Sequence, residues 1–291
     1  MSTVPEIHRF TSIRPPKVTF IGATAIAALG LIVGSWVFVL GADRVQSQPF
    51  FSVETLERGG RFLQALLGIG SSSTPAFAQW AAWQDTARLA YQTLAMSVLA
   101  IGIAALIALA TFMFGASNIM RGELAPYRSW VWGSGFFVVR AFYTFTRAIP
   151  ELVWAMLIIF MFAPGLLPGA LALGIHNAGV LGKLSSEVVE GLDTRPLLAL
   201  RSSGAGRFQV LAYGVLPQAL PRFITYLFYR WELIIRTTIV VGFVAAGGLG
   251  LEFRLSMSYF HYTTVTLLLI WYLVLVVAVD LIAAVLRRMA R

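Results

Sequence analysis

The sequence predicts an all-α integral membrane protein with about six transmembrane helices. Of its 291 residues, 58% are hydrophobic and only 12% are charged, and the mean hydropathy is +0.78. Soluble domains carry about 25% charged residues. Long apolar runs alternate here with short segments that hold most of the 22 Lys and Arg residues. This alternation is typical of a chain that crosses a membrane several times.

The first apolar run covers residues 18–40. It is longer than the 7–15 residues, roughly, of a signal-peptide core, so we expect an uncleaved span, although a small-residue site near Gly41 leaves cleavage as an alternative. Residues 53–67 are amphipathic and are predicted to lie on the membrane surface. A second span is predicted at about 88–114. We place a boundary between an N-terminal region, 1–85, and a transmembrane domain, 86–291.

The third predicted span, at about 149–163, is short and ends before Pro164. The preceding segment, "FFVVRAFYTFTRA", carries Arg140 and Arg147 seven residues apart, which places both on one helical face. A surface helix leading into the span is therefore expected. Three further spans are predicted at about 168–189, 219–246 and 264–286.

The basic residues predict the orientation of these spans. With the N-terminus inside, fourteen loop or terminal Lys and Arg residues are cytoplasmic and four are external. Such a bias is the positive-inside rule. An even number of spans then places both termini in the cytoplasm, together with the basic segment at 190–218.

Several classes of site are disfavoured by the sequence. Cysteine is absent, and the three histidines have no metal-ligand spacing. The segment "GVLGKLS" resembles a phosphate-binding loop but has Asn177 and Leu184 where Gly and Ser or Thr are required. We therefore expect no catalytic residue, no metal site and no ATP hydrolysis in this chain. The net charge of +9 is explained by topology rather than by nucleic-acid binding.

The segment "RPLLALRSSGAGRFQVLAYGVLP" is predicted to form two short helices. The first follows Pro196, and Gly204 ends it because glycine allows a left-handed turn. The second ends at Pro217, which opens the next span at a first-turn position. Leu197, Leu198 and Leu200, among others, form an apolar side of this segment. We expect this side to face a groove on a partner protein.

This segment resembles the EAA loop of type I ABC-transporter permeases, the methionine-permease-like fold. Four residues occupy the positions of the family's first alanine, its glycine and its Leu-Pro pair: Ala199, Gly204, Leu216 and Pro217. Two positions depart, because Leu198 replaces the motif's glutamate and Gly214 replaces an aliphatic residue. The general resemblance extends over about residues 86–286.

The resemblance implies a permease subunit in a prokaryotic cytoplasmic membrane. Its implied partners are a second permease chain, expected to form a homodimer, two P-loop ATPase subunits that bind ATP and Mg, and an external solute-binding protein. No cofactor is expected on this chain itself. The residues implied to couple it to the ATPase are Leu198, Ala199, Gly204, Arg207, Leu216 and Pro217.

A narrower resemblance, to phosphonate ABC-transporter permeases, rests on "YLFYRWELIIRTTIVVGFVAAGGLG" from Tyr226, "RAIPELVWA" and "LPQALPRFITY". It implies transport of phosphonate or a related oxyanion such as phosphate or phosphite. A permease for a methionine-like or other small solute is the alternative in the same fold, and a membrane enzyme or scaffold is the alternative from another class.

Charged residues inside the fifth span are the candidates for substrate chemistry. Counting from Leu220, Arg230 and Arg236 lie roughly 15 and 24 Å along the helix. Glu232 and Arg236 share a face and are expected to pair, whereas Arg230 points elsewhere and needs another partner. The charges either lock helices together or line an anion path. The predicted path residues are Arg230, Glu232, Arg236, Thr237, His176 and Asn177. His176 and Asn177 have interhelical contacts as their alternative role, and Glu151 is predicted to cap a helix.

Overall fold

The computed structural model describes residues 19–43, 52–70, 74–120 and 130–290. The predicted cytoplasmic tail before residue 18 and the polar link at 121–129 lie outside these ranges. The chain divides into two compact units, residues 1–62 and 63–291. All regular secondary structure in the described ranges is helical.

The first unit contains the first predicted span as a single helix. α1, Phe20–Asp43, is 24 residues long and uncharged up to its last residue. α2, Val53–Leu66, starts in this unit and corresponds to the predicted amphipathic segment. The Thr55 backbone N–H donates to Ser52 Oγ (3.2 Å), and Arg58 pairs with Glu54 one turn away (3.4 Å). These local contacts start α2 and stabilise its polar side.

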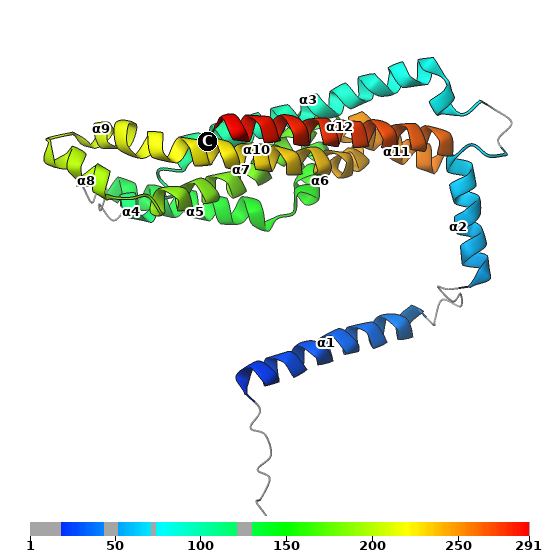
Figure 1. The fold of residues 1–291 in the computed structure, drawn as a ribbon, viewed down its shortest axis with the longest axis horizontal. Coiled ribbons are helices and arrows are strands. Elements are labelled where there is room, and N and C mark those ends of the chain that lie inside the picture. The colour runs from blue at the N-terminus through cyan, green and yellow to red at the C-terminus, as the bar shows by residue number, and fades with distance from the viewer. Residues whose placement is uncertain (1–18, 44–51, 71–73, 121–129, 291) are drawn as a thin grey trace, which may run out of the picture. The chain divides into compact units, whose positions relative to one another are not determined.

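The second unit is a bundle of long helices (Figure 1). The long helices are α3 (Trp80–Thr111), α5 (Trp130–Ala148), α7 (Leu166–Glu190), α10 (Leu216–Val241) and α12 (Tyr262–Met289). Short elements connect them: η2 (Ala76–Ala78), α4 (Ser117–Met120), α6 (Glu151–Phe162), α8 (Arg195–Ser202), α9 (Arg207–Gln209), η3 (Val210–Val215), η4 (Gly242–Ala246) and α11 (Gly248–Ser258). α4, α8 and α9 lie at one end of the bundle, and α11 lies at the other (Figure 1).

α7 is the central helix of this bundle and packs against α3, α5, α6 and α10. Its glycines allow close approach: a methyl group on Gly179 would lie 2.0 Å from Thr146 Oγ1, and one on Gly182 would lie 2.4 Å from the Tyr143 ring. Tyr143 is fully buried, and its hydroxyl is 2.8 Å from Thr111 Oγ1. Small residues therefore position α3, α5 and α7 against one another, as in many membrane bundles.

The described helices support the prediction of about six spans. Residues 20–41, 80–111 and 262–289 are each long and apolar enough to cross a membrane unaided. Two further stretches qualify as bent pairs, 133–148 with 151–162, and 207–244 with 248–258. α7 does not meet the same criteria, because it carries His176 and Asn177 in its middle and three charged residues toward its end. By length and composition, the described residues therefore hold three candidate spans, or up to five if each bent pair is one span.

The prediction for the third span was wrong in its geometry. α5 is not a surface helix but packs along α7, and α6 turns away from it by 95°. The break falls at Pro150, which has no N–H to continue a helix. The carbonyls freed there are satisfied from other helices, because Trp154 Nε1 donates to Thr146 O (3.0 Å) and His176 Nδ1 is 3.0 Å from Ile149 O.

The prediction of a loop after the fifth span was also wrong, because most of that segment forms α11, Gly248–Ser258. Gly247 and Gly248 have φ values of +90° and +65°, which L side chains rarely adopt. They redirect the chain by 48° after α10. The Leu249 N–H then donates to Thr93 Oγ1 (2.9 Å), which fixes the start of α11 against α3.

Candidate functional site

The segment from α8 to α10 forms one end of the bundle (Figure 1). α8 and the left-handed turn at Gly204, with φ +86°, are as predicted. The second short helix is not separate, because α9 and η3 run directly into α10. The Leu216 N–H reaches back five residues to Leu211 O, so the wide turn of η3 precedes Pro217 and accommodates its ring.

The apolar side of α8 is divided between the bundle and the exterior. Leu197 is fully buried and fills the space beside Gly214, where a methyl group would lie 2.4 Å from Leu197 Cδ2. This contact explains why glycine occupies a position where the EAA pattern has an aliphatic residue, and it corrects the expectation that Leu197 faces a partner. The exposed apolar side chains at this end are Leu198, Phe208 (86% exposed) and Tyr213. The two aromatic residues were not among the predicted coupling residues.

The other predicted coupling residues lie at the same end. Ala199 and Pro217 are exposed, and Leu216 packs into the apolar cluster around Leu197. Arg207 is partly buried at the start of α9. The Gly206 N–H just before it donates to Gln209 Oε1 (2.7 Å), which caps α9.

Two of the charges in α10 pair with α12 rather than with each other. Glu232 accepts a hydrogen bond from Arg287, and Arg236 Nη2 lies 2.6 Å from Asp280 Oδ2. The predicted pair between Glu232 and Arg236 is therefore wrong. The physical reason is that α12 lies against α10 and presents an opposite charge to each residue. Sequence reasoning missed Asp280 and Arg287 because helix spacing identifies partners only within one helix.

Arg230 has a neutral partner on the central helix. Its Nε donates to Asn177 Oδ1 (2.9 Å), and its Nη2 donates to the same oxygen. Asn177 is itself held, because its Nδ2 donates to Leu173 O (2.8 Å). The expectation that Arg230 needs a partner from another helix is confirmed. Since an amide carries no charge, this partner orients the guanidinium group without neutralising it.

His176 faces the break between α5 and α6, one residue before Asn177. Its Nε2 lies 3.6 Å from Glu151 Oε2, while its Nδ1 contacts Ile149 O. Glu151 is the first residue of α6, where a carboxylate suits the helix dipole. It also acts electrostatically on Arg230 without forming an ion pair with it. Thr237 donates to Ile234 O within its own helix (3.1 Å).

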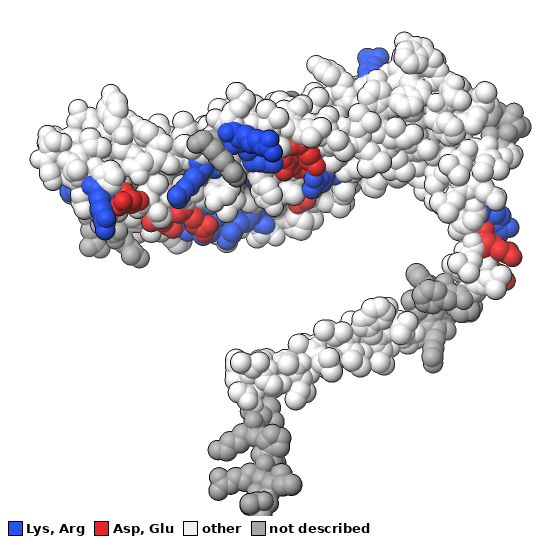
Figure 2. Space-filling view, viewed as in Figure 1, with Lys and Arg blue, Asp and Glu red and all other residues white. Residues whose placement is uncertain are grey.

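Charged side chains are unevenly distributed over the second unit. On the face seen in Figure 2, they gather in the half of the bundle that carries α8 and around its middle, and most of the remaining surface is uncharged. Large apolar side chains such as Leu106, Phe137 and Leu281 are exposed on this unit. Such a surface suits a lipid environment.

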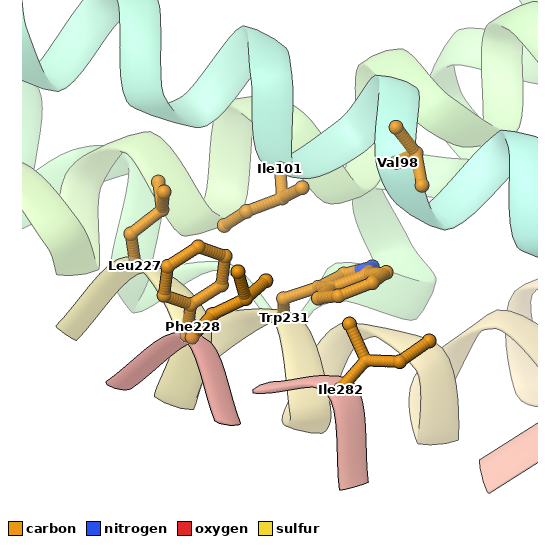
Figure 3. Close-up of a pocket in the computed structure, with 7 residues that line it drawn as sticks. Val98, Ile101, Leu227, Phe228, Trp231 and Ile282 are labelled. Carbon is orange, nitrogen blue, oxygen red and sulfur yellow. The ribbon is translucent and has the colours of Figure 1, made fainter. Parts of the chain in front are cut away.

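A cavity of about 250 Å³ lies between α3, α10 and α12 (Figure 3). Its lining is entirely apolar and consists of Val98, Ile101, Leu227, Phe228, Trp231, Ile282 and Leu286. A cavity without polar groups does not suit an oxyanion. Within the described residues, no group of three His, Asp or Glu side chains is arranged to hold a metal ion.

Comparison with known sequences gives a family and several relatives. Residues 133–291 match the family described as binding-protein-dependent transport system inner membrane component. A phosphite transport system permease protein of Stutzerimonas stutzeri is 35% identical over 75% of each chain. A phosphate-import permease protein of Mycolicibacterium smegmatis is 34% identical over 69% of this chain and 36% of its own. A putative cryptic phosphonate transport system permease protein of Escherichia coli is 39% identical over 40% of this chain and 97% of its own.

Comparison with solved structures supports the fold. An amino acid ABC transporter solved with histidines matches with a TM-score of 0.58 at 17% identity, over 72% of this chain and 98% of its own. The inward-facing MetNI methionine ABC transporter matches with a TM-score of 0.58 at 19% identity, over 71% and 96%. These structures share the fold that the sequence analysis predicted.

Proposed function

Because the chain belongs to the family of binding-protein-dependent transport system inner membrane components, we propose that it is the permease subunit of an ABC importer for a phosphorus oxyanion. Membership confirms the predicted resemblance, and it confirms a transport subunit rather than an enzyme. The observation that carries the substrate class is the 35% identity, over 75% of both chains, to a phosphite transport permease. Phosphonate, phosphite and phosphate are the candidate substrates.

The α8 end of the bundle is the proposed docking surface for the ATPase. Leu198, Phe208 and Tyr213 expose apolar area there, next to the left-handed turn at Gly204. Buried aromatic side chains commonly dominate such interfaces. The assembly would comprise two copies of this chain, two P-loop ATPase subunits that bind ATP and Mg, and an external solute-binding protein. No cofactor on this chain is needed for this role.

The α8 end is proposed to face the cytoplasm, with both chain termini on the same side of the membrane. Positive charge supports this orientation, because α8 and α9 carry Arg195, Arg201 and Arg207, and α12 ends with Arg287 and Arg288. α11 would then lie at the external side, where the binding protein docks.

The translocation path is proposed to pass Arg230. Glu232 and Arg236 are each paired with α12, so Arg230 is the one of these three whose charge is not balanced by an ion pair in the described structure. A guanidinium group binds tetrahedral oxyanions with forked hydrogen bonds. Asn177 orients it, and His176 lies beside Asn177. Glu232, Arg236 and Thr237 would support the path by holding α10 in place.

Reconstitution tests this function directly. The tagged full-length chain should co-purify with a P-loop ATPase, and proteoliposomes with the binding protein should take up radiolabelled phosphite, phosphate or a phosphonate only when ATP is supplied. Co-purification without an ATPase would contradict the transport role. Uptake of methionine in place of all three oxyanions would leave the permease role intact and overturn the substrate class.

A further inference from the structure

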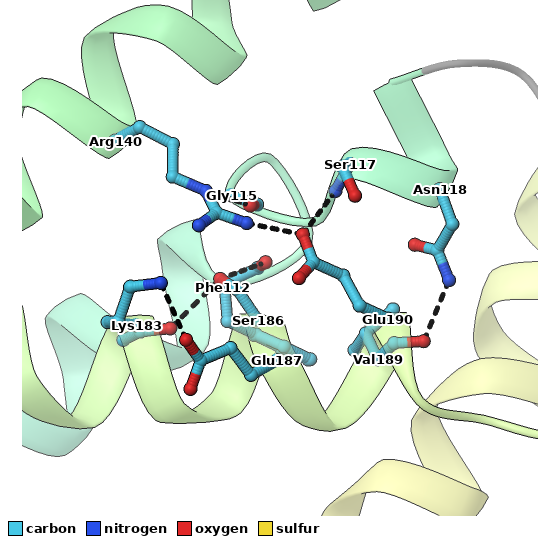
Figure 4. A network of polar contacts seen from close by, with 11 residues as sticks. Phe112, Gly115, Ser117, Asn118, Arg140, Lys183, Ser186, Glu187, Val189 and Glu190 are labelled. Carbon is cyan, nitrogen blue, oxygen red and sulfur yellow. Dashed lines mark hydrogen bonds and ion pairs between the residues drawn. The ribbon is translucent and has the colours of Figure 1, made fainter. Parts of the chain in front are cut away.

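A cluster of polar contacts joins three helices immediately before α8. Glu190, the last residue of α7, accepts hydrogen bonds at Oε1 from the Ser117 backbone N–H (2.8 Å) and from Arg140 Nη2 (Figure 4). Arg140 Nε donates in turn to Gly115 O (2.8 Å). One carboxylate therefore ties α7 to α5 and to the turn between α3 and α4. We call this group of four residues the Glu190 clamp.

Neighbouring contacts join the same elements. Asn118 Nδ2 donates to Val189 O (2.8 Å), and Ser186 Oγ donates to Phe112 O (2.9 Å). Both side chains are buried. A methyl group on Gly115 would lie 2.4 Å from Ser186 Oγ, so the turn sits directly on α7. The end of α3, α4 and the end of α7 are thus closely connected at this point.

The clamp lies where a force on α8 would enter the bundle. α8 starts five residues after Glu190. Its buried Leu197 belongs to the same apolar cluster as Ile119 of α4 and Val189 of α7. Further along α7, away from α8, lies Asn177, which orients Arg230. Packed residues therefore connect α8 to the proposed oxyanion contact, and the clamp lies on this route.

We propose that Arg140 and Glu190 are positioning residues for energy coupling: the Glu190 clamp makes the α3–α4 turn, α5 and α7 move together when the ATPase displaces α8. This inference rests on the proposed function. Without the clamp, the turn at Gly115 and the short link after Glu190 would absorb part of the displacement. ATP would then be hydrolysed with less transport.

The clamp is suited to isolation by mutation. The side chains of Arg140 and Glu190 are 25% and 26% exposed, so their pairing is partly screened by solvent. Apolar packing around Tyr143 and Leu197 holds the same region together. Glu190→Gln keeps the shape of the side chain and an oxygen for the Ser117 N–H, while it removes the charge that holds Arg140.

The experiment measures oxyanion molecules taken up per ATP hydrolysed by the full complex in proteoliposomes, with phosphite and its binding protein. Glu190→Gln and Arg140→Gln should assemble, retain their basal ATPase rate and lower this ratio by about fivefold or more. Glu187→Gln is the matched control, because Glu187 lies about one turn earlier on α7 and, among the described residues, its carboxylate pairs only with Lys183 of the same helix (2.6 Å). It should leave the ratio unchanged.

An unchanged ratio in both clamp variants would overturn the inference. So would failure of both variants to assemble, or a parallel loss of ATPase rate and uptake, because either result indicates a purely structural role. A wild-type complex that takes up no phosphorus oxyanion would instead count against the proposed function, and the two failures are therefore distinguishable.

Discussion

Asn177 and Arg230 join the central helix to the fifth span through a single oxygen. Both Nε and Nη2 of Arg230 donate to Asn177 Oδ1, and the Asn177 side chain is only 2% exposed. The amide therefore orients the guanidinium group and, because it is uncharged, does not neutralise that group. Burial of Asn177 means that this geometry is set by the packing of α7 rather than by solvent.

Replacing Asn177 tests whether the charge of Arg230 matters for transport. Asn177→Asp should keep the hydrogen bonds to Arg230 but neutralise it, while it loses the donor to Leu173 O. Initial uptake of phosphite should therefore fall about tenfold, the equivalent of one charged hydrogen bond. Arg230→Gln should have a similar effect. Both are measured in ATP-driven proteoliposomes, with complex assembly monitored by size-exclusion chromatography. Undiminished uptake by an assembled Asn177→Asp variant would remove Arg230 from the path.

Arg236 is expected to behave differently because Asp280 already balances its charge (2.6 Å). Arg236→Ala leaves Asp280 alone in the membrane, and Oδ1 of that carboxylate is buried without a hydrogen-bond partner in the described structure. Because Asp280 lies in a membrane-spanning helix, its unpaired carboxylate should lower the free energy of unfolding by about 1–3 kcal/mol. Thermal unfolding in detergent measures it.

Arg236→Ala should also lower phosphite uptake, because α10 loses a contact with α12. The double variant Arg236→Ala/Asp280→Ala removes both charges and should recover most of the stability and uptake that Arg236→Ala loses. A double variant that is stable but transports as poorly as the single one would mean that Arg236 contacts the anion itself.

The features predicted correctly from sequence are those determined by local chemistry. Apolar length predicted α1 and α12, and the conformational freedom of glycine predicted the turn at Gly204. The need of Arg230 for a partner followed from its angular position on one helix. Each of these depends on residues close together in the chain.

The errors concern contacts between distant segments. The spacing of Arg140 and Arg147 on one face predicts a surface helix at α5, but Glu190, fifty residues after Arg140, accepts a hydrogen bond from it. Likewise, helix spacing pairs Glu232 with Arg236, but in the structure Glu232 accepts its hydrogen bond from Arg287 of α12. No periodicity within one helix contains this information, because the partner is chosen by tertiary packing.

Close packing of α7 on α5 predicts a stability effect at Gly182. An added methyl group would lie 2.4 Å from the fully buried Tyr143 ring, which cannot move aside without losing its contact with Thr111. Gly182→Ala should therefore destabilise the protein by about 1–3 kcal/mol. The measurement is thermal unfolding in detergent.

Gly102→Ala is the control for this substitution, because nothing lies within 4 Å of the methyl group it would add to α3. It should be neutral or slightly stabilising, since alanine favours helix. Equal unfolding temperatures for the Gly182→Ala variant and the wild type would contradict the close contact between α5 and α7.

The exposed aromatic residues at the α8 end predict where the ATPase binds. Phe208 is 86% exposed, follows Arg207 in α9, and belongs to the region that resembles a coupling loop. Phe208→Ala should therefore reduce the ATPase recovered with the purified chain by about tenfold, as expected for an aromatic side chain central to an interface.

Phe160→Ala is a matched control, because Phe160 is also 86% exposed but lies on α6, away from α8. It should leave the recovery unchanged, since exposure alone does not make an ATPase contact. If the two variants lost the ATPase equally, or if neither did, Phe208 would not be part of the docking surface.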